Sequence, residues 1–120
     1  MRKIFTFSIA LLALTTFATG RNDREVVLHH SGSNSNDQIY IEPPYVTYDD
    51  DLNELYVYFG STSTIDLEYL DSTGMPCTLV NGESHPGYTS ATYYSLPTGY
   101  YTITIHSIYG YTYYGNFTVS

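Results

Sequence analysis

The ten residues from Leu96 to Ile105 constrain the fold more than any other part of the chain. They read Leu-Pro-Thr-Gly-Tyr-Tyr-Thr-Ile-Thr-Ile, so a Pro-Gly turn leads into strict alternation of polar and apolar side chains. Alternation with a period of two predicts a β-strand that is buried on one face, and the turn sets where that strand begins. The inward positions are Tyr101, Ile103 and Ile105, and the outward positions are Tyr100, Thr102, Thr104 and His106.

The same alternation recurs along the chain and predicts an all-β fold. It is clearest in the runs from Leu55 to Phe59 and from Ile65 to Tyr69, and beyond Asn36 no window shows apolar residues at helical spacing for more than a turn. Turn signals follow at Asp71–Gly74, Pro97–Gly99 and Tyr109–Tyr111. Short strands at intervals of about 8 to 12 residues, with a tyrosine opening a late strand, are typical of sandwiches. We therefore predict an immunoglobulin-like or fibronectin type III-like antiparallel β-sandwich of about seven strands.

The alternation also predicts which side chains form the core. The inward set comes from several strands in a consistent phase, and each buried member would contribute about 1.5 to 3 kcal/mol before chain entropy is subtracted. Tyr69 is a further core candidate. The set is Leu55, Val57, Phe59, Ile65, Leu67, Leu96, Tyr101, Ile103, Ile105, Phe117 and Val119.

Five less regular segments are assigned from composition. Val26–Leu28 and Tyr113–Val119 are expected to form edge strands, which makes them candidates for pairing with another chain. Pro76–Val80 is a short strand whose proline suits an edge, Asn81–Gly87 is a loop, and Tyr93–Leu96 is a strand that runs into the Pro-Gly turn.

The first twenty residues have the pattern of a secretory signal peptide. A positively charged start precedes an apolar run from Ile4 to Ala18, and small residues follow. The run is shorter than the roughly 20 residues needed to cross a bilayer, so we expect cleavage after Ala18 or Gly20 and no membrane insertion afterwards. Beyond residues 1–20 we expect a flexible segment with a short edge strand (residues 21–36) and then the sandwich (residues 37–120). The protein is expected to be exported, periplasmic or extracellular.

Charge and cysteine content exclude several roles. The chain has four Lys and Arg against 12 Asp and Glu, a net charge of −8. Removal of residues 1–20 leaves two arginines against all twelve carboxylates, a net charge of −10. Such a charge repels nucleic acid and anionic membranes. Cys77 is the only cysteine, so no internal disulfide forms, and its thiol is either buried and inert or bridged to another molecule.

Several of these motifs together resemble one family. The exported leader, the Arg/Glu-containing start, the Asp-Ser-Thr-Gly turn, the Leu-Pro-x-Gly-x-Tyr turn and the terminal Gly-Asn-Phe-Thr-Val look like the domain of unknown function 3244 family. The resemblance covers nearly all of the chain after the leader. It implies a small exported protein of anaerobic gut bacteria with an immunoglobulin-like or fibronectin-like sandwich. It implies no activity and no site residues.

Tyrosine is the unusual residue of this chain, with fifteen copies and no tryptophan. Tyrosine rings stack on sugars and dominate many binding surfaces, although strand preference alone also places tyrosine on half-buried strands. Immunoglobulin-like strand order puts Tyr56 and Tyr58 outside one sheet and a second polar set outside the other. We predict that this second set is the ligand face: Tyr100, Tyr114, His106, Asp66 and Glu68, with Thr102 and Thr104 beside them.

Other candidate sites are weaker. Asp49, Asp50 and Asp51, followed by Asn53 and Glu54, could offer oxygens to Ca²⁺, but the spacing is not that of an EF-hand, and a solvated hairpin turn is the competing interpretation.

The histidines, His29, His30, His85 and His106, lie in different predicted segments without paired spacing. A metal site is therefore not predicted, and neither is any other cofactor. No nucleophile elbow, zinc helix or phosphate loop occurs.

Two short motifs concern modification. Asp71-Ser72-Thr73 resembles the acidic-hydroxyl motif at which proteins of such bacteria are O-glycosylated, so Ser72 and Thr73 are candidates. Asn116-Phe117-Thr118 spells an N-glycosylation sequon, but for an exported bacterial protein we interpret it as part of the last strand.

The predicted function is an exported, non-enzymatic domain that binds an envelope protein or a glycan. The alternative is a structural domain that pairs edge strands with a partner or with its own copy, and a small secreted hydrolase is a remote third. We expect a monomer.

Overall fold

The computed structural model describes residues 23–31 and 42–120, so the predicted signal peptide lies outside the described residues. All regular secondary structure in the described residues is β-strand. The strands are β2 (Asp23–Glu25), β3 (His29–Ser31), β4 (Tyr45–Asp49), β5 (Glu54–Phe59), β6 (Ser63–Leu70), β7 (Pro76–His85), β8 (Thr89–Tyr94), β9 (Gly99–Ser107) and β10 (Thr112–Val119).

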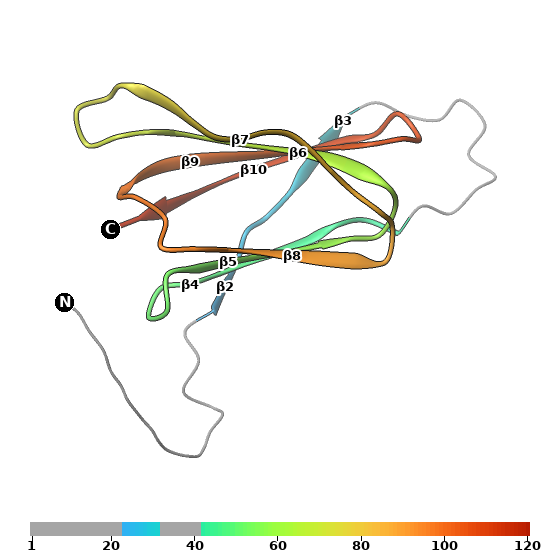
Figure 1. The fold of residues 1–120 in the computed structure, drawn as a ribbon, viewed down its shortest axis with the longest axis horizontal. Helices are drawn as coiled ribbons and strands as arrows, with labels where there is room; N and C mark the ends of the chain where they lie inside the picture. The colour runs from blue at the N-terminus through green and yellow to red at the C-terminus, as the bar shows by residue number, and fades with distance from the viewer. Residues whose placement is uncertain (1–22, 32–41) are drawn as a thin grey trace, which may run out of the picture.

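The strands form two antiparallel sheets that face each other (Figure 1). One sheet has five strands in the order β3-β10-β9-β6-β7, and the other has four in the order β2-β4-β5-β8. The chain changes sheet between β5 and β6, between β7 and β8, and between β8 and β9. The predicted immunoglobulin-like sandwich is confirmed, with β4 to β10 as its seven main strands and β2 and β3 added to them.

The core lies between the two sheets and contains every predicted inward residue. All eleven members of the predicted set are buried. Tyr69, which is partly buried, packs against them. Alternation sorts these residues correctly because each strand has one face in the core and one in water. The core also contains four residues that the pattern missed: Val26, Val46, Tyr48 and Tyr113.

A tyrosine corner fixes the start of β9. The ring of Tyr101 is fully buried and stacks between Tyr69 at 4.7 Å and Phe117 at 5.0 Å, measured between ring centroids. Its hydroxyl donates a 2.6 Å hydrogen bond to the carbonyl of Pro97, which holds the turn against the strand. Burial raises the pKa of the Tyr101 phenol well above its usual range, so the group stays a donor.

The N-terminal segment belongs to both sheets. β2 pairs with β4 in one sheet, and β3 pairs with β10 in the other. The prediction of an edge strand at Val26–Leu28 is therefore wrong, because these residues cross from one sheet to the other, as the cyan ribbon in Figure 1 shows. Gly115 makes the crossing possible, because a Cβ there would lie 2.7 Å from the carbonyl oxygen of Val27.

This crossing also changes the predicted edges. β10 lies between β9 and β3, so the prediction that Tyr113–Val119 is an edge strand is wrong at its start. β3 pairs with Thr112 to Tyr114, and the described pairings of residues 115–119 are to β9. The edge strands of the main sandwich at the opposite side are β7 and β8.

A β-bulge hides the second half of β7 from sequence analysis. Asn81–Gly87 was expected to be a loop, but β7 continues to His85, and the loop prediction is wrong over residues 81–85. The register between β6 and β7 shifts around Leu67, and Gly82 takes a φ of +67°. Its N–H donates a 2.7 Å hydrogen bond to Oδ1 of Asp66. The register shifts on both sides of Leu67, each time with one extra residue on β7, and these residues break the alternation on which the prediction relied.

β8 also differs from its prediction. It spans Thr89–Tyr94 rather than Tyr93–Leu96, and Ser95 turns the chain with a φ of +55°. Leu96 still reaches the core from outside the strand, with 4% exposure. The burial of Leu96 was predicted correctly, but its assignment to a strand was wrong.

Arg24 ties three parts of the chain together. Its guanidinium donates to both carboxylate oxygens of Asp50, at 2.7 and 2.9 Å, and to the carbonyl of Thr118 at 2.9 Å. The same group lies 5.2 Å from the ring centroid of Tyr48. Arg24 is the only Lys or Arg among residues 23–31 and 42–120. It therefore links the N-terminal crossing to the β4–β5 turn and to the end of β10.

Candidate functional site

The predicted ligand residues all lie on the outer face of the five-stranded sheet. The register arranges this face in rows that cross β6, β9 and β10. From one end of the face to the other, the rows are Thr64–His106–Thr112, Asp66–Thr104–Tyr114, Glu68–Thr102–Asn116 and Leu70–Tyr100–Thr118. The structure therefore brings Tyr100, Tyr114, His106, Asp66 and Glu68 onto one surface.

The two tyrosines of this surface stand apart from each other. Tyr100 is 48% exposed and pairs with Thr118, whereas Tyr114 is 43% exposed and pairs with Thr104. On β9 the two rows contain Tyr100 and Thr104, which are four positions apart, or about 13 Å along the strand. Tyr114 has a ring neighbour in His29, with centroids 5.7 Å apart. The surface thus has two separate tyrosine rings, with the hydroxyl, amide and carboxylate groups of the Glu68–Thr102–Asn116 row between them.

Asp66, His106 and Thr112 form a hydrogen-bonded series on this surface. Nε2 of His106 lies 3.3 Å from Oδ2 of Asp66, and Nδ1 of His106 lies 3.2 Å from Oγ1 of Thr112. The other oxygen of Asp66 accepts the Gly82 N–H. Asp66 therefore holds both the bulge of β7 and the imidazole of His106.

The order carboxylate, imidazole and hydroxyl is that of a hydrolase triad, and sequence analysis missed it. The residues lie on three strands, far apart along the chain, so no motif reveals them. A working triad activates its hydroxyl in a site that excludes water. The His106 side chain is 47% exposed on an open sheet face. The arrangement orients hydrogen-bonding groups toward solvent and provides no shielding for a developing charge.

The acidic hairpin does not gather its carboxylates around one point. Oδ1 of Asp49 accepts the N–H groups of Asp51 and Leu52, and Asp49 is 3% exposed. Asp50 pairs with Arg24. Among residues 23–31 and 42–120, no three His, Cys, Asp or Glu side chains are grouped so that they could hold a metal ion. The stretch is the β4–β5 hairpin turn, as the competing interpretation held.

Asn53, the fourth candidate in this stretch, is also engaged within the fold. Its Oδ1 accepts the Tyr48 hydroxyl at 2.8 Å, and its Nδ2 donates to the carbonyl of Leu96 at 3.0 Å. With a φ of +53°, Asn53 also receives the Ser95 N–H at its carbonyl. It joins the β4–β5 turn to the turn before β9.

A second polar cluster joins the edge strands β7 and β8, and sequence analysis missed it as well. Oε1 of Glu83 accepts the Tyr93 hydroxyl at 2.6 Å and lies 2.7 Å from Nε2 of His85. The His85 ring stacks on Phe59 with centroids 4.5 Å apart. Hydrogen bonds from Tyr93 and His85 lower the pKa of Glu83, and burial is the main cause that raises the pKa of Tyr93. The cluster closes one side of the sandwich.

Ser72 and Thr73 lie on the exposed β6–β7 turn, as predicted. Oδ1 of Asp71 accepts the Thr73 hydroxyl at 2.6 Å and the backbone N–H groups of Thr73 and Met75. These bonds, with the Thr73 hydroxyl first, lower the pKa of Asp71. Gly74 completes the turn with a φ of +86°. Ser72 is exposed, and O-glycosylation of Ser72 or Thr73 stays a prediction.

Cys77 is partly exposed on the edge strand β7, so the prediction of a buried thiol is wrong. Its Sγ lies 3.7 Å from the carbonyl of Met75. A hydrogen bond with this thiol, together with partial burial, raises the pKa of Tyr69. Pairing with Tyr69 across β6 and β7 places Cys77 at the rim of the core.

The outer face of the four-stranded sheet carries a second group of tyrosines. Tyr56 and Tyr58 point outward there, as predicted, and Tyr45 lies directly opposite Tyr58 across β4 and β5. Tyr94 lies opposite Glu54 across β5 and β8. Sequence analysis missed Tyr45 and Tyr94, because the register that makes them neighbours is not visible in the alternation of one strand.

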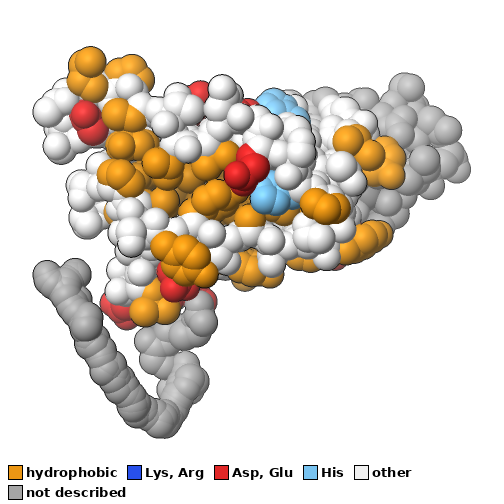
Figure 2. Space-filling view, viewed as in Figure 1, with side chains coloured by type: hydrophobic (Ala, Val, Ile, Leu, Met, Phe, Trp, Pro, Cys, Tyr) orange, Lys and Arg blue, Asp and Glu red, His pale blue; other side chains and the backbone are white. Residues whose placement is uncertain are grey.

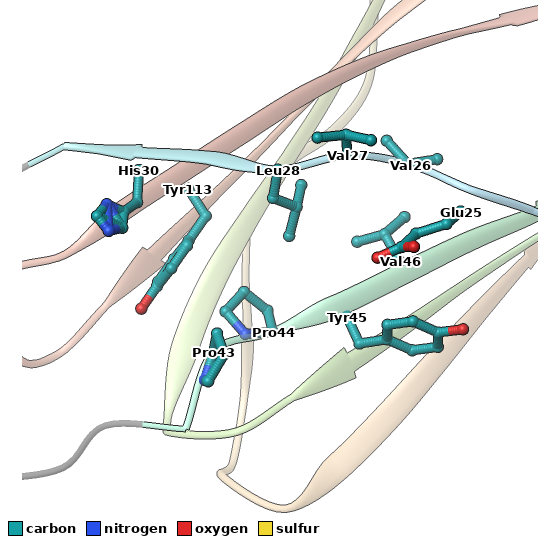
Figure 3. Close-up of a pocket in the computed structure, with 10 residues that line it drawn as sticks. All are labelled: Glu25, Val26, Val27, Leu28, His30, Pro43, Pro44, Tyr45, Val46 and Tyr113. Atoms are coloured by element: carbon teal, nitrogen blue, oxygen red, sulfur yellow. The ribbon is translucent and has the colours of Figure 1, made fainter.

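An apolar hollow of about 260 Å³ lies beside the N-terminal crossing (Figure 3). Leu28 and Pro44 point toward it from the crossing and from the start of β4. Its other lining residues are Glu25, Val26, Val27, His30, Pro43, Tyr45, Val46 and Tyr113. The hollow is formed mainly by aliphatic, proline and tyrosine side chains and groups no set of catalytic side chains.

Comparisons with known proteins yield no match: no family model, curated protein or solved structure is significantly similar to the chain. Membership of the domain of unknown function 3244 family therefore stays a prediction. Within the described ranges no helix has the length and apolar character to pass through a bilayer.

Proposed function

We propose that the chain is an exported, non-enzymatic β-sandwich domain that binds a partner in the bacterial envelope, a glycan or a protein. The observation that supports this most is the outer face of the five-stranded sheet. Five residues chosen from sequence as ligand contacts lie there in adjacent rows. Both tyrosines remain nearly half exposed.

The chemistry of this face fits a polyhydroxylated ligand. Tyrosine rings stack on the flat faces of sugars, and fixed hydroxyl, amide and carboxylate groups bond to their hydroxyls. Thr102 and Asn116 are already joined by a 2.9 Å hydrogen bond in the row between the tyrosines. Asp66 and His106 are held in place by Gly82 and Thr112. A glycan that spans about 13 Å could contact both rings.

The test is retention on immobilised polysaccharides, with the full chain expressed for export so that the cell performs any processing. We expect at least one polysaccharide to retain the protein, and the double variant Tyr100→Thr with Tyr114→Thr to lose that retention. Threonine keeps strand preference and removes the ring. A matched double variant on the other sheet, Tyr45→Thr with Tyr56→Thr, should be retained normally. Equal retention of both variants would remove this face as the binding surface.

The structural alternative rests on β7, which is a ten-residue edge strand. The features of β7 act against pairing, because Pro76 lacks an N–H and the bulge at Gly82 interrupts the edge. Light scattering over a concentration series separates the two functions. A constant monomer mass supports binding through a face, and a mass that rises with concentration supports pairing through an edge.

The hydrolase alternative rests on the series Asp66, His106 and Thr112. Exposure of His106 to water disfavours it. Hydrolysis of p-nitrophenyl acetate separates the two functions, because a triad would lose activity in a Thr112→Val variant. A non-enzymatic domain would show the same background rate with and without that substitution.

A further inference from the structure

The outer face of the four-stranded sheet has a continuous cluster of tyrosines, unlike the opposite face. Tyr45 and Tyr58 pair directly across β4 and β5, and Tyr56 is the next outward residue along β5. Tyr45 is 48% exposed and Tyr56 is 37% exposed. In Figure 3, Tyr45 lies on the opposite side of β4 from the buried Val46. Cross-strand partners have Cβ atoms about 5 Å apart, so these rings form one surface.

Tyr88 extends the cluster at the connection between β7 and β8. The Tyr88 N–H donates a 2.7 Å hydrogen bond to the carbonyl of Phe59, the residue after Tyr58. Desolvation, Glu42 and the phenols of Tyr88 and Tyr56 raise the pKa of Tyr58. Tyr88 has a φ of +62° and is 77% exposed. A bulky residue rarely adopts this backbone conformation, and here its side chain gains little burial in return. Tyr88 therefore adds an exposed ring beside the Tyr58 end of the cluster.

Carboxylates are interspersed with the rings on this face. Glu54 lies opposite Tyr94, which is 65% exposed, and two residues before Tyr56 on the same face of β5. Oε1 of Glu42 accepts the Tyr58 hydroxyl at 3.3 Å. Eleven of the twelve carboxylates of the chain lie in the described ranges, against the single cation Arg24. On the side in view in Figure 2, red carboxylates are visible and no residue has the dark blue of Lys or Arg.

One internal contact shows which group binds to a tyrosine ring and a neighbouring carboxylate at the same time. Arg24 lies over the ring of Tyr48 at 5.2 Å while its guanidinium forms two hydrogen bonds with Asp50. A planar guanidinium satisfies both neighbours at once, because it stacks on a ring and forms a fork with a carboxylate. Glu54 with Tyr56 and Tyr94 offers the same two groups to a ligand from outside.

We propose that this tyrosine and carboxylate face binds an extended, arginine-containing segment of another protein. Glu54 and Tyr58 are four positions apart on β5, which is about 13 Å along the strand. Glu42, which accepts the Tyr58 hydroxyl, lies at the Tyr58 end. Residues four positions apart in an extended peptide have the same separation. The partner segment therefore presents arginines at about this spacing. A second copy of the chain is not the occupant, because its own net charge of −8 would repel this face.

The test measures binding of a peptide of four Gly-Arg-Ser-Gly repeats, which places arginines four positions apart, to the full chain, expressed for export, by isothermal titration calorimetry. The same peptide with citrulline in place of arginine is the neutral control. We expect the double variant Tyr45→Thr with Tyr56→Thr to bind the arginine peptide at least about tenfold more weakly. The double variant Tyr100→Thr with Tyr114→Thr removes two tyrosines without changing charge, and its affinity should stay within about twofold of the unaltered protein.

Four results would overturn the proposal. Equal loss of affinity in both double variants would mean that net charge alone attracts the peptide. Equal binding of the citrulline peptide, or no binding of either peptide, would remove arginine as the recognised group. Loss of polysaccharide retention in the Tyr45 and Tyr56 variant would make this face a glycan site instead.

Glu54→Gln is a second variant for the case in which the tyrosine changes lower the thermal midpoint. It leaves every ring in place and removes one charge. We expect affinity for the arginine peptide to fall about threefold, as for one exposed ion pair, and unchanged affinity would contradict the role of Glu54. The peptide measurements can succeed or fail whether or not any polysaccharide is retained, because the two ligands are proposed to bind opposite faces.

Discussion

The two outer faces of the sandwich both carry tyrosine, but they arrange it differently. On the five-stranded sheet, the rows of Tyr100 and Tyr114 are four positions apart on β9, and hydrogen-bonding side chains fill the one row between them. On the four-stranded sheet, Tyr45, Tyr56 and Tyr58 are direct neighbours beside carboxylates. The first arrangement suits a long ligand with many hydroxyls. The second suits a flat cation. Register between strands, rather than the number of tyrosines, decides what each face can bind.

The comparison depends first on which side chains of β9 point into the core. A charge at one of these inward positions should have the largest effect on stability. Ile103 is fully buried, so Ile103→Asp places an unpaired charge in the core. We expect it to cost more than about 4 kcal/mol and to abolish the cooperative transition in thermal denaturation followed by circular dichroism. Tyr100→Asp, on the outward face of the same strand, should cost about 1 kcal/mol. A soluble Ile103→Asp variant with an unchanged midpoint would refute the phase of the strand.

The next prediction separates a structural tyrosine from a surface one. Tyr101→Phe removes the hydroxyl that donates to the carbonyl of Pro97 and leaves that carbonyl without this partner. We expect a loss of about 1 to 2 kcal/mol in urea-induced unfolding. Tyr100→Phe changes the adjacent, exposed residue and should stay within about 0.5 kcal/mol of the unaltered protein. Similar losses in both variants would show that the tyrosine corner is not a specific stabilising contact.

How much of this molecule the sequence predicts differs between core and surface. Alternation places Tyr101, Ile103 and Phe117 in the core, because a strand with one wet face repeats its pattern every two residues. It cannot place Val26 or Tyr113, because their burial depends on a crossing between sheets at Gly115. The two register shifts of β7 defeat the pattern for a related reason, since each added residue inverts the phase of the alternation at that point.

The same limit applies to the candidate sites. Outward alternation was enough to group Tyr100, His106 and Tyr114 on one face. The sequence could not show that Thr112 lies beside His106, or that Tyr45 lies beside Tyr58, because neighbours across strands are set by register. Local sequence thus predicts which face a side chain occupies, and the pairing of strands decides its companions.

A third prediction tests the internal arginine contact on which the cation proposal relies. Arg24→Gln removes the pair with Asp50 and the contact with Tyr48. Because the pair is partly exposed, we expect a loss of about 1 kcal/mol, smaller at high salt. Arg24→Lys keeps the charge but lacks the planar fork, and it should recover less than half of that loss. Full recovery by lysine would show that charge alone matters at this contact, and would weaken the argument for arginine recognition.

The smallest expected effect is a dependence of stability on pH near the cluster that joins β7 and β8. Hydrogen bonds from Tyr93 and His85 lower the pKa of Glu83 below its ordinary value of 4.5. A lowered pKa in the folded state contributes stability above the unfolded value, and this contribution is lost as pH falls through the folded value. Urea midpoints should therefore fall on acidification below about pH 5, and less steeply in a Glu83→Gln variant. Identical slopes for the two proteins would contradict this role of Glu83.

The most direct test of the account measures both ligand classes against both double variants in one set of binding experiments. We predict that Tyr100→Thr with Tyr114→Thr loses polysaccharide retention and keeps the arginine peptide. We predict that Tyr45→Thr with Tyr56→Thr does the reverse. If one double variant loses both ligands, or if neither loses either, then the two faces do not have the separate binding roles that their registers suggest.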